Sequence, residues 1–278
     1  MADRTNIEYC DATWNPATGC TPASEGCDNC WARRMATRLR GRAGYPADDP
    51  FRPTWHADRV DAPLHWRKPR VIAVGFMGDL FHEDQYEVAS RHVLDIARET
   101  PRHTYLLLTK RPHIAAKRLL GTNPPGNVWI GVTAETQATY WARLHHLRVF
   151  SDCAWNTWLS LEPLLGPVDL DGLEGVDQVV LGGESGPGSR TMRLDWARSV
   201  RDQCKDAGVP FYFKQWGDWA PPCQLPDGEA RRSFEWQQGS GWGRFPEPYA
   251  FIEPRRFGKR CAGRLLDGRT HDDLAWRA

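Results

Sequence analysis

The chain has 278 residues and a formal net charge of +1, from 36 Lys and Arg against 35 Asp and Glu. This balance excludes a histone-like protein that binds nucleic acid through bulk positive charge, although it permits a local basic patch. Hydrophobic residues make up 41% of the chain, which is enough to bury a core and excludes wholesale disorder. No run approaches the roughly 18 apolar residues of a membrane-spanning helix. The N-terminus has no apolar signal core, so we expect a cytoplasmic protein without a membrane partner.

Short apolar runs alternate with longer amphipathic runs along most of the chain. The β-branched and aromatic runs predict strands: residues 7–14, 70–75, 103–108, 127–132, 156–160, 177–181 and 210–213. Apolar residues at helical spacing predict helices between them: residues 29–39, 85–98, 112–120, 137–149 and 195–207. The first of these helices places Trp31, Met35 and Leu39 on one face.

About seven strands in a repeated strand-then-helix order predict a parallel sheet with right-handed crossovers. The fold class is therefore α/β, and a complete or partial (β/α) TIM-like barrel is the favoured architecture, with an open doubly wound sheet as the alternative. We expect the barrel to span residues 1–216.

Two segments do not follow the alternation. Residues 40–69 are rich in Arg, Pro, His and Asp and are expected to form an ordered, irregular insertion. Residues 217–278 are dense in Gly, Pro, Arg and Trp. Six aromatic residues from Trp236 to Phe257 would be costly to leave in water, so we expect this segment to pack on the barrel as a C-terminal extension.

Ionisable residues recur directly after the predicted strands. The carboxyl ends of barrel strands meet at one rim, where active sites are built, so this repetition predicts a polar pocket there. The residues concerned are Asp79, Lys110, Arg111, Glu135, Glu162, Glu184 and Lys214. From this position alone, Lys110, Glu162 and Lys214 are candidate catalytic residues that orient substrate or move protons.

The loop at residues 181–188 is the strongest glycine signal in the chain, with four glycines that follow a predicted strand. Its sequence, Leu-Gly-Gly-Glu-Ser-Gly-Pro-Gly, matches neither a Walker loop nor the dinucleotide-binding fingerprint. Glycines that follow a strand let a ligand approach the backbone, so the loop favours a small polar ligand.

Three cysteines lie within eleven residues, in the order C-x6-C-x2-C. Cys20, Cys27 and Cys30 come just after the first strand and before the first helix, which places them at the same rim. A structural zinc site takes four protein ligands, and Cys10, His56 or a distant cysteine could supply the fourth. Three cysteines without a fourth suit an iron–sulfur cluster that leaves one iron open for another ligand.

The cysteine segment, residues 13–32, resembles the N-terminal signature of the phage gene-product thirty-seven/sixty-eight proteins, a three-Cys-motif domain of unknown function. The resemblance continues through further motifs to the end of the chain, at residues 78–82, 108–112, 130–135, 159–166, 182–188, 211–217 and 263–268. It therefore covers nearly the whole chain and implies a phage-encoded protein in the host cytoplasm.

That family in turn resembles the radical S-adenosylmethionine (SAM) enzymes, which use a (β/α) barrel and three cysteines that ligate a 4Fe-4S cluster. The resemblance implies that Cys20, Cys27 and Cys30 are the cluster ligands. It also implies that Glu135 and the Gly182-Gly183-Glu184 loop contact SAM. This chain departs from the family pattern C-x3-C-x2-C in its first gap, which is six residues long.

We therefore expect a radical SAM-like 4Fe-4S enzyme that modifies a nucleotide or nucleic acid and acts with a partner enzyme encoded nearby. One alternative is a zinc-stabilised nucleic-acid-binding module without catalysis. Another is a barrel hydrolase that uses Glu162 and Glu184 as an acid–base pair, with structural cysteines.

Overall fold

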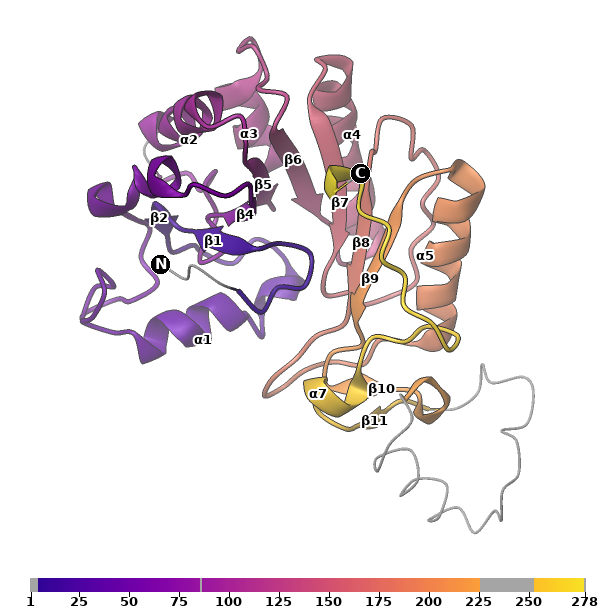
Figure 1. The fold of residues 1–278 in the computed structure, drawn as a ribbon. Helices are drawn as coiled ribbons and strands as arrows, with labels where there is room; N and C mark the ends of the chain where they lie inside the picture. The colour runs from indigo at the N-terminus through magenta and orange to yellow at the C-terminus, as the bar shows by residue number, and fades with distance from the viewer. Residues whose placement is uncertain (1–4, 86, 226–252, 278) are drawn as a thin grey trace, which may run out of the picture.

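The computed structural model describes residues 5–85, 87–225 and 253–277, and its centre is a seven-stranded sheet (Figure 1). The strands run in the order β1-β4-β5-β6-β7-β8-β9, and every neighbouring pair is parallel. Their bounds are β1 Ala12–Trp14, β4 Val71–Val74, β5 Thr104–Thr109, β6 Val128–Thr133, β7 Asn156–Leu161, β8 Val179–Gly182 and β9 Phe211–Gln215. The predicted parallel sheet is confirmed.

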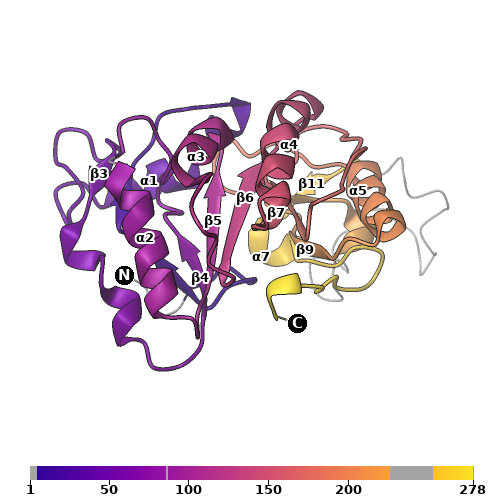
Figure 2. The same cartoon turned by 90° about the horizontal axis from the view of Figure 1, so that it is seen from above.

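Four helices cover one face of this sheet, as Figure 2 shows from above. They are α2 Glu87–Glu99, α3 Pro112–Leu119, α4 Gln137–Asp152 and α5 Leu194–Ala207. Their buried side chains join two apolar clusters with the outward-facing residues of the strands, for example Leu144 of α4 with Val132 of β6. A third cluster takes its members from the other face of the strands and includes no residue of these four helices.

The other face of the sheet is buried by the curl of the sheet itself. Tyr9, which precedes β1, makes edge-on ring contacts with Trp158 of β7 (centroids 6.1 Å apart) and Tyr212 of β9 (5.9 Å). β1 and β9 form opposite edges of the sheet, so these contacts require the sheet to bend round on itself. The architecture is the partial TIM-like barrel among the predicted alternatives.

The barrel interior is closed at the amino ends of its strands by Trp276. This indole, 7% exposed, lies against Trp129 at the start of β6 and against Trp158, with centroids 5.4 and 5.5 Å apart. Its Nε1 donates to the Tyr9 carbonyl at 3.2 Å. Trp129, Trp158 and Trp276 thus form an aromatic plug at the amino ends of the strands. The carboxyl ends of the strands, which the polar residues follow, lie at the opposite end of the barrel.

The helix α1, Trp31–Arg38, is not part of the outer layer. Its buried residues are Ala32 and Ala36, which join a small cluster at the rim with Met77 from the loop after β4. Trp31 and Met35, which helical spacing places together on one face, are 50% and 38% exposed. The small alanine side chains let the helix approach the rim closely and leave the large residues outside.

The segment at residues 40–69 forms short elements beside α1. β3 (Thr54–Trp55) pairs antiparallel with β2 (Ala17–Thr18), and two 3-10 turns follow, η2 (Ala57–Arg59) and η3 (Ala62–His65). His56 is buried and lies 2.8 Å from the Thr18 hydroxyl. Burial, aided by the Arg59 guanidinium and opposed by Asp58, lowers the pKa of His56 to about 4.

The described part of the C-terminal segment packs beside β8 and β9. It contains β10 (Trp219–Ala220), paired antiparallel with β11 (Arg255–Arg256), the turn η4 (Pro222–Gln224), the helix α7 (Lys259–Ala262) and the turn η6 (Ala275–Arg277). Ala262 and Leu266 belong to the same apolar cluster as Phe213 of β9. Of the six aromatic residues expected to pack here, five lie outside the described residues: Trp236, Trp242, Phe245, Tyr249 and Phe251. Across the described ranges, no helix has both the length and the apolar character to cross a bilayer.

Candidate functional site

The three clustered cysteines lie on the segment that joins β2 to α1, at the rim formed by the carboxyl ends of the strands. Cys27 ends a 3-10 turn, Glu25–Cys27, and Cys30 is the N-cap residue of α1. Gly19 pairs in parallel with Gly78 of the loop after β4, and a Cβ on Gly78 would lie 2.4 Å from the Gly19 carbonyl oxygen. This close backbone approach fixes the start of the cysteine segment against the rim. All three thiols are free and partly exposed.

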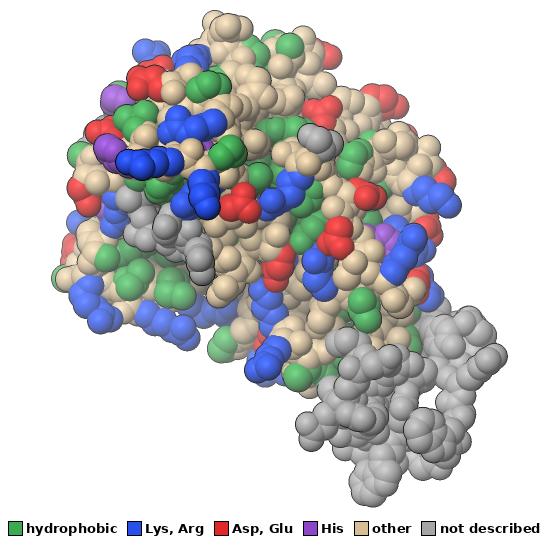
Figure 3. All heavy atoms as spheres, viewed as in Figure 1, with side chains coloured by type: hydrophobic (Ala, Val, Ile, Leu, Met, Phe, Trp, Pro, Cys, Tyr) green, Lys and Arg blue, Asp and Glu red, His purple; other side chains and the backbone are tan. Residues whose placement is uncertain are grey.

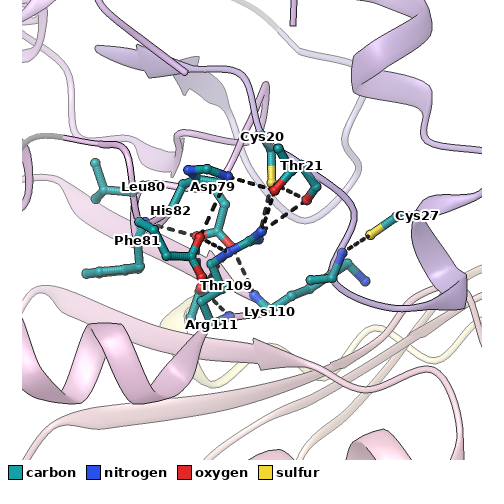
Figure 4. A network of polar contacts seen from close by, with 12 residues as sticks. Cys20, Thr21, Cys27, Asp79, Leu80, Phe81, His82, Thr109, Lys110 and Arg111 are labelled. Atoms are coloured by element: carbon teal, nitrogen blue, oxygen red, sulfur yellow. Dashed lines mark hydrogen bonds and ion pairs between the residues drawn. The ribbon is translucent and has the colours of Figure 1, made fainter. Parts of the chain in front are cut away.

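Cys20 lies beside the polar ends of β4 and β5 (Figure 4). Arg111 donates to its sulfur at 3.3 Å and to the hydroxyl of Thr21 at 3.0 Å. Asp79 accepts hydrogen bonds from the Thr109 hydroxyl at 2.8 Å and the Lys110 amide at 3.1 Å. Burial, with the nearby Asp79 carboxylate, raises the pKa of Cys20 to about 12 despite the guanidinium.

The surroundings of Cys27 favour the thiolate more than those of Cys20 do. Its sulfur accepts a hydrogen bond from the Ala23 amide at 3.5 Å. Burial acts to raise its pKa, but the backbone hydrogen bonds from Ala23 and Ser24 and the Lys110 ammonium outweigh burial, so the pKa of Cys27 lies below its ordinary value. This part of the segment therefore favours a negatively charged sulfur, the form that ligates a metal.

Glu135, which follows β6, joins the first part of the cysteine segment to the barrel. It is fully buried and forms ion pairs with Lys110 and with Arg143 of α4, the latter at 2.9 Å. Ser24 donates to the same carboxylate at 2.7 Å. Gly26 is so close that an added Cβ would lie 2.4 Å from Oε1 of Glu135. Burial lowers the pKa of Lys110 to about 8, against the opposing effect of the Cys27 sulfur.

Glu184, in the glycine-rich loop after β8, joins the last part of the same segment to the barrel. It accepts bonds from Nε and Nη2 of Arg190, at 3.0 and 2.7 Å, and from Asn29 at 3.1 Å. Asn29 lies directly before Cys30 and also donates to the Gly188 carbonyl at 2.7 Å. Burial acts to raise the pKa of Glu184, but the hydrogen bonds from Arg190 and Asn29 hold it below its ordinary range.

A second charged group lies deeper in the barrel. Lys214 of β9 pairs with Glu162, which follows β7, at 2.6 Å. Glu162 also accepts bonds from Ser160 at 3.1 Å and from the Tyr9 hydroxyl at 3.3 Å. The Lys214 ammonium lies 5.1 Å from the centroid of the Tyr9 ring. These side chains point inward and place an ion pair between the aromatic plug and the rim.

Gly182 and Gly183 connect this ion pair to the loop that carries Glu184. A Cβ on Gly182 would lie 2.9 Å from Oε1 of Glu162, and one on Gly183 would lie 1.9 Å from the carbonyl oxygen of Trp216. The Gly183 amide donates to the Gln215 carbonyl at 2.9 Å. Glycine is required at position 183, because the ends of β8 and β9 approach too closely there for a side chain.

The predicted site residues therefore fall into two groups, one at the rim and one deeper in the barrel. Glu135 and Glu184 contact the cysteine segment, and Lys110 pairs with Glu135 beside it, whereas Glu162 and Lys214 form the inner ion pair. Four residues that complete these networks are not among the predicted site residues: Tyr9, Asn29, Arg143 and Arg190. Of these, only Arg143 has a sequence signal, since it interrupts the apolar face of its helix.

The donor set at the rim fits a 4Fe-4S cluster. Three thiols are available on one segment, and the cations of Lys110, Arg111 and Arg143 lie beside that segment, where they can balance the negative charge of a thiolate-ligated cluster. Within the described ranges, no group of three or more His, Cys, Asp or Glu side chains is placed to hold a single metal ion. Cys10 lies in the barrel interior, and the His56 ring is bonded to Thr18.

Comparisons with known proteins give one family match. A search of curated proteins finds no match. Among solved structures, the complex of spore photoproduct lyase with dinucleoside spore photoproduct is similar at a TM-score of 0.46 and 11% identity, covering 86% of this chain and 66% of the other. A double variant of that lyase with bound AdoMet and the same photoproduct gives 0.45 and 12%, covering 69% and 60%. The family model described as a protein of unknown function (DUF5131) matches residues 4–275, so the chain belongs to that family.

Proposed function

We propose that this protein is a radical SAM-type iron–sulfur enzyme that modifies a nucleotide or nucleic acid. The observation that carries the proposal is the position of three free thiols on one segment at the rim of a partial (β/α) barrel. In the proposal, Cys20, Cys27 and Cys30 hold a 4Fe-4S cluster, as the resemblance to the phage family and to radical SAM enzymes implies. When bound and reduced by an external electron donor, such a cluster would supply the electron for the reductive cleavage of SAM.

The carboxylates around the cysteine segment have a positioning role in this proposal. Glu135 and Glu184 each accept hydrogen bonds both from cationic groups and from the segment itself, through Ser24 and Asn29. They thereby fix the segment at two points, one on each side of Cys27. Gly182 and Gly183 leave side-chain-free backbone beside the inner ion pair, and we assign SAM contacts to this surface.

The inner pair of Glu162 and Lys214 has the catalytic role. Glu162 receives hydrogen bonds from Ser160 and Tyr9 and an ion pair from Lys214, so its carboxylate is held in one orientation. Lys214 can donate a proton or hydrogen bond to a substrate that enters from the rim. Lys110 sits closer to the cysteine segment, where it can orient the same substrate.

The hydrolase alternative has less support from the geometry. Glu162 is bonded to Tyr9, Ser160 and Lys214, whereas Glu184 is bonded to Asn29 and Arg190. The hydrogen bonds from Arg190 and Asn29 hold the pKa of Glu184 below its ordinary range, so Glu184 does not suit the role of the acid in such a pair.

The proposal is tested by anaerobic purification, iron and sulfide analysis and absorption spectra with and without SAM. We expect brown protein with about four irons per chain and a spectral change on adding SAM. Cys27→Ala should lose iron and SAM cleavage together. Cys153→Ala, which removes an exposed cysteine far along the sequence at the end of α4, is the matched control and should keep both. Colourless protein with stoichiometric zinc would contradict the proposal, as would Cys27→Ala with unchanged iron.

A further inference from the structure

The helix α1 and the turn after it form the most arginine-rich stretch of the described chain. Residues 31–42 contain five arginines and no acidic residue, although the chain as a whole carries a net charge of only +1. The arginines are Arg33, Arg34, Arg38, Arg40 and Arg42. The excess of positive charge is therefore local, and it begins directly after Cys30.

One of these arginines has a structural role. Arg34 donates to the carbonyls of Pro187 at 3.1 Å and Ser185 at 3.0 Å, both in the loop after β8. The helix therefore runs across the rim, joined at its start to the cysteine segment and at Arg34 to the glycine-rich loop. A ligand bound along α1 would lie next to the proposed active site.

The other four arginines are exposed, and none of them has a carboxylate partner among the residues that the structure describes. Arg40 donates to the backbone carbonyls of Ala47 and Asp48, Arg42 donates to that of Arg38, and Arg33 lies over the ring of Phe51. None of the four forms an ion pair with a carboxylate of the described residues. Figure 3 shows Lys and Arg side chains gathered along the edge of the molecule where Figure 1 places α1.

Exposed apolar side chains accompany this charge. Trp31 is 50% exposed and immediately follows Cys30, and Met35, one helical turn later, is 38% exposed. Guanidinium groups match phosphate geometry, and an indole offers a face on which an unpaired base stacks. An acidic protein would be matched by the charge alone, whereas the adjacent exposed indole specifically fits a base.

We propose that residues 31–42 form the binding surface for a single-stranded nucleic acid. Arg33, Arg38 and Arg42 contact the phosphates, and Trp31 stacks on a base beside the cysteine segment. A double helix keeps its bases stacked on one another, so an indole at this position selects a single strand. The inference rests on the proposed function, because the strand bound along α1 is the substrate on which the enzyme would act at the rim.

The test is fluorescence anisotropy with a labelled single-stranded oligonucleotide of mixed sequence, longer than the roughly 4–16 nucleotides that a single-strand-binding domain covers. The titration is repeated at several salt concentrations. The test variant is Arg33→Ser/Arg38→Ser/Arg42→Ser. The matched control removes the same charge from the outer helices, as Lys117→Ser/Arg148→Ser/Lys205→Ser.

We expect the wild-type protein to bind the single strand more tightly than the matching duplex. Each phosphate contact on a single strand contributes about 0.7 to the slope of log K against log salt, so the test variant should reduce the slope by about 2. At 0.1 M salt this corresponds to a loss of affinity of about 100-fold. Trp31→Ala should weaken binding by about 5- to 150-fold with an unchanged salt slope. The control variant should have the same salt slope as the wild-type protein.

Equal losses of affinity for the single strand in the test and control variants would overturn the proposal. Tighter binding to the duplex than to the single strand would also overturn it. Binding of anionic phospholipid vesicles, lost in the same arginine variant while the oligonucleotide does not bind, would assign the surface to a membrane instead. The binding readout requires no cluster. Protein that lacks iron but binds the strand contradicts only the proposed function, whereas protein that cleaves SAM but does not bind the strand contradicts only this inference.

Discussion

Replacing Glu135 by Gln removes a buried negative charge from between two cations. The carboxylate is fully buried, and its partners Lys110 and Arg143 have side chains that are 21% and 8% exposed. Glutamine preserves the shape but leaves both cations without their counter-charge. Breaking a buried ion pair by removal of one partner costs about 3–5 kcal/mol, so we expect Glu135→Gln to lower the free energy of unfolding by that amount.

The assay is thermal unfolding by calorimetry, with urea unfolding as a second measure. For a chain of this size each kcal/mol corresponds to roughly 2 °C, so the expected fall in Tm is about 6–10 °C. Glu174→Gln is the matched control, because it breaks an exposed ion pair with Arg148 whose side chains are 85% and 45% exposed. Exposed pairs contribute less than about 1 kcal/mol, so the control should shift Tm by under about 2 °C.

A double variant separates the charge effect from a loss of packing. Lys110→Met keeps a long apolar stem and removes one of the two unpaired cations. Combined with Glu135→Gln, it should recover part of the lost stability, because only Arg143 then remains unpaired. A Tm for Glu135→Gln equal to that of Glu174→Gln would refute the reasoning, as would a double variant that loses the full sum of the two single losses.

Three further predictions concern stability. The folded-state pKa of His56, about 4, lies below its ordinary value of 6.5, so on acidification this ring takes up a proton in the unfolded chain before it does in the folded one. The contribution of His56 to the free energy of unfolding is complete above pH 6.5, and that free energy should fall by about 2 kcal/mol by roughly pH 5. In urea unfolding, His56→Gln should show a fall on acidification that is smaller by that amount. Trp276→Ala should lower the free energy of unfolding by about 3–5 kcal/mol, because it empties the interior beside Trp158; a change under 1 kcal/mol in urea unfolding would contradict the role of this plug. Gly183→Ala should reduce soluble yield and Tm, because its Cβ meets the Trp216 carbonyl, whereas Gly126→Ala, which meets nothing within 4 Å, should unfold as the parent protein does.

The strands and helices of the barrel could be predicted from sequence because their signals are local. The run that predicts a strand at residues 103–108 is β5, Thr104–Thr109, and the spacing that predicts a helix at residues 195–207 is α5, Leu194–Ala207. Errors lie where tertiary contacts override local pattern. The strand predicted at residues 7–14 extends only over Ala12–Trp14, because Tyr9 turns into the barrel interior to contact Trp158 and Tyr212.

The same division holds for the candidate site. The order of strands and helices determines which residues reach the rim, so Lys110 and Glu135 could be placed there from sequence alone. Which polar side chains pair with one another could not be predicted, because Asn29 and Glu184 are 155 residues apart in the chain and Tyr9 and Glu162 are 153 apart. Only the curl of the sheet brings such groups within hydrogen-bond distance.

The sequence by itself determined the parallel strand–helix order, the polar strand ends and the three-cysteine segment, since each depends on neighbouring residues. The tertiary structure decided what surrounds those cysteines: Arg111 beside Cys20, Lys110 near Cys27 and two anchoring carboxylates. It also decided that the alanines of α1 face the rim while Trp31 is exposed. The physical reason is that burial and charge pairing are set by the whole packed chain, whereas propensity and periodicity are properties of a short stretch.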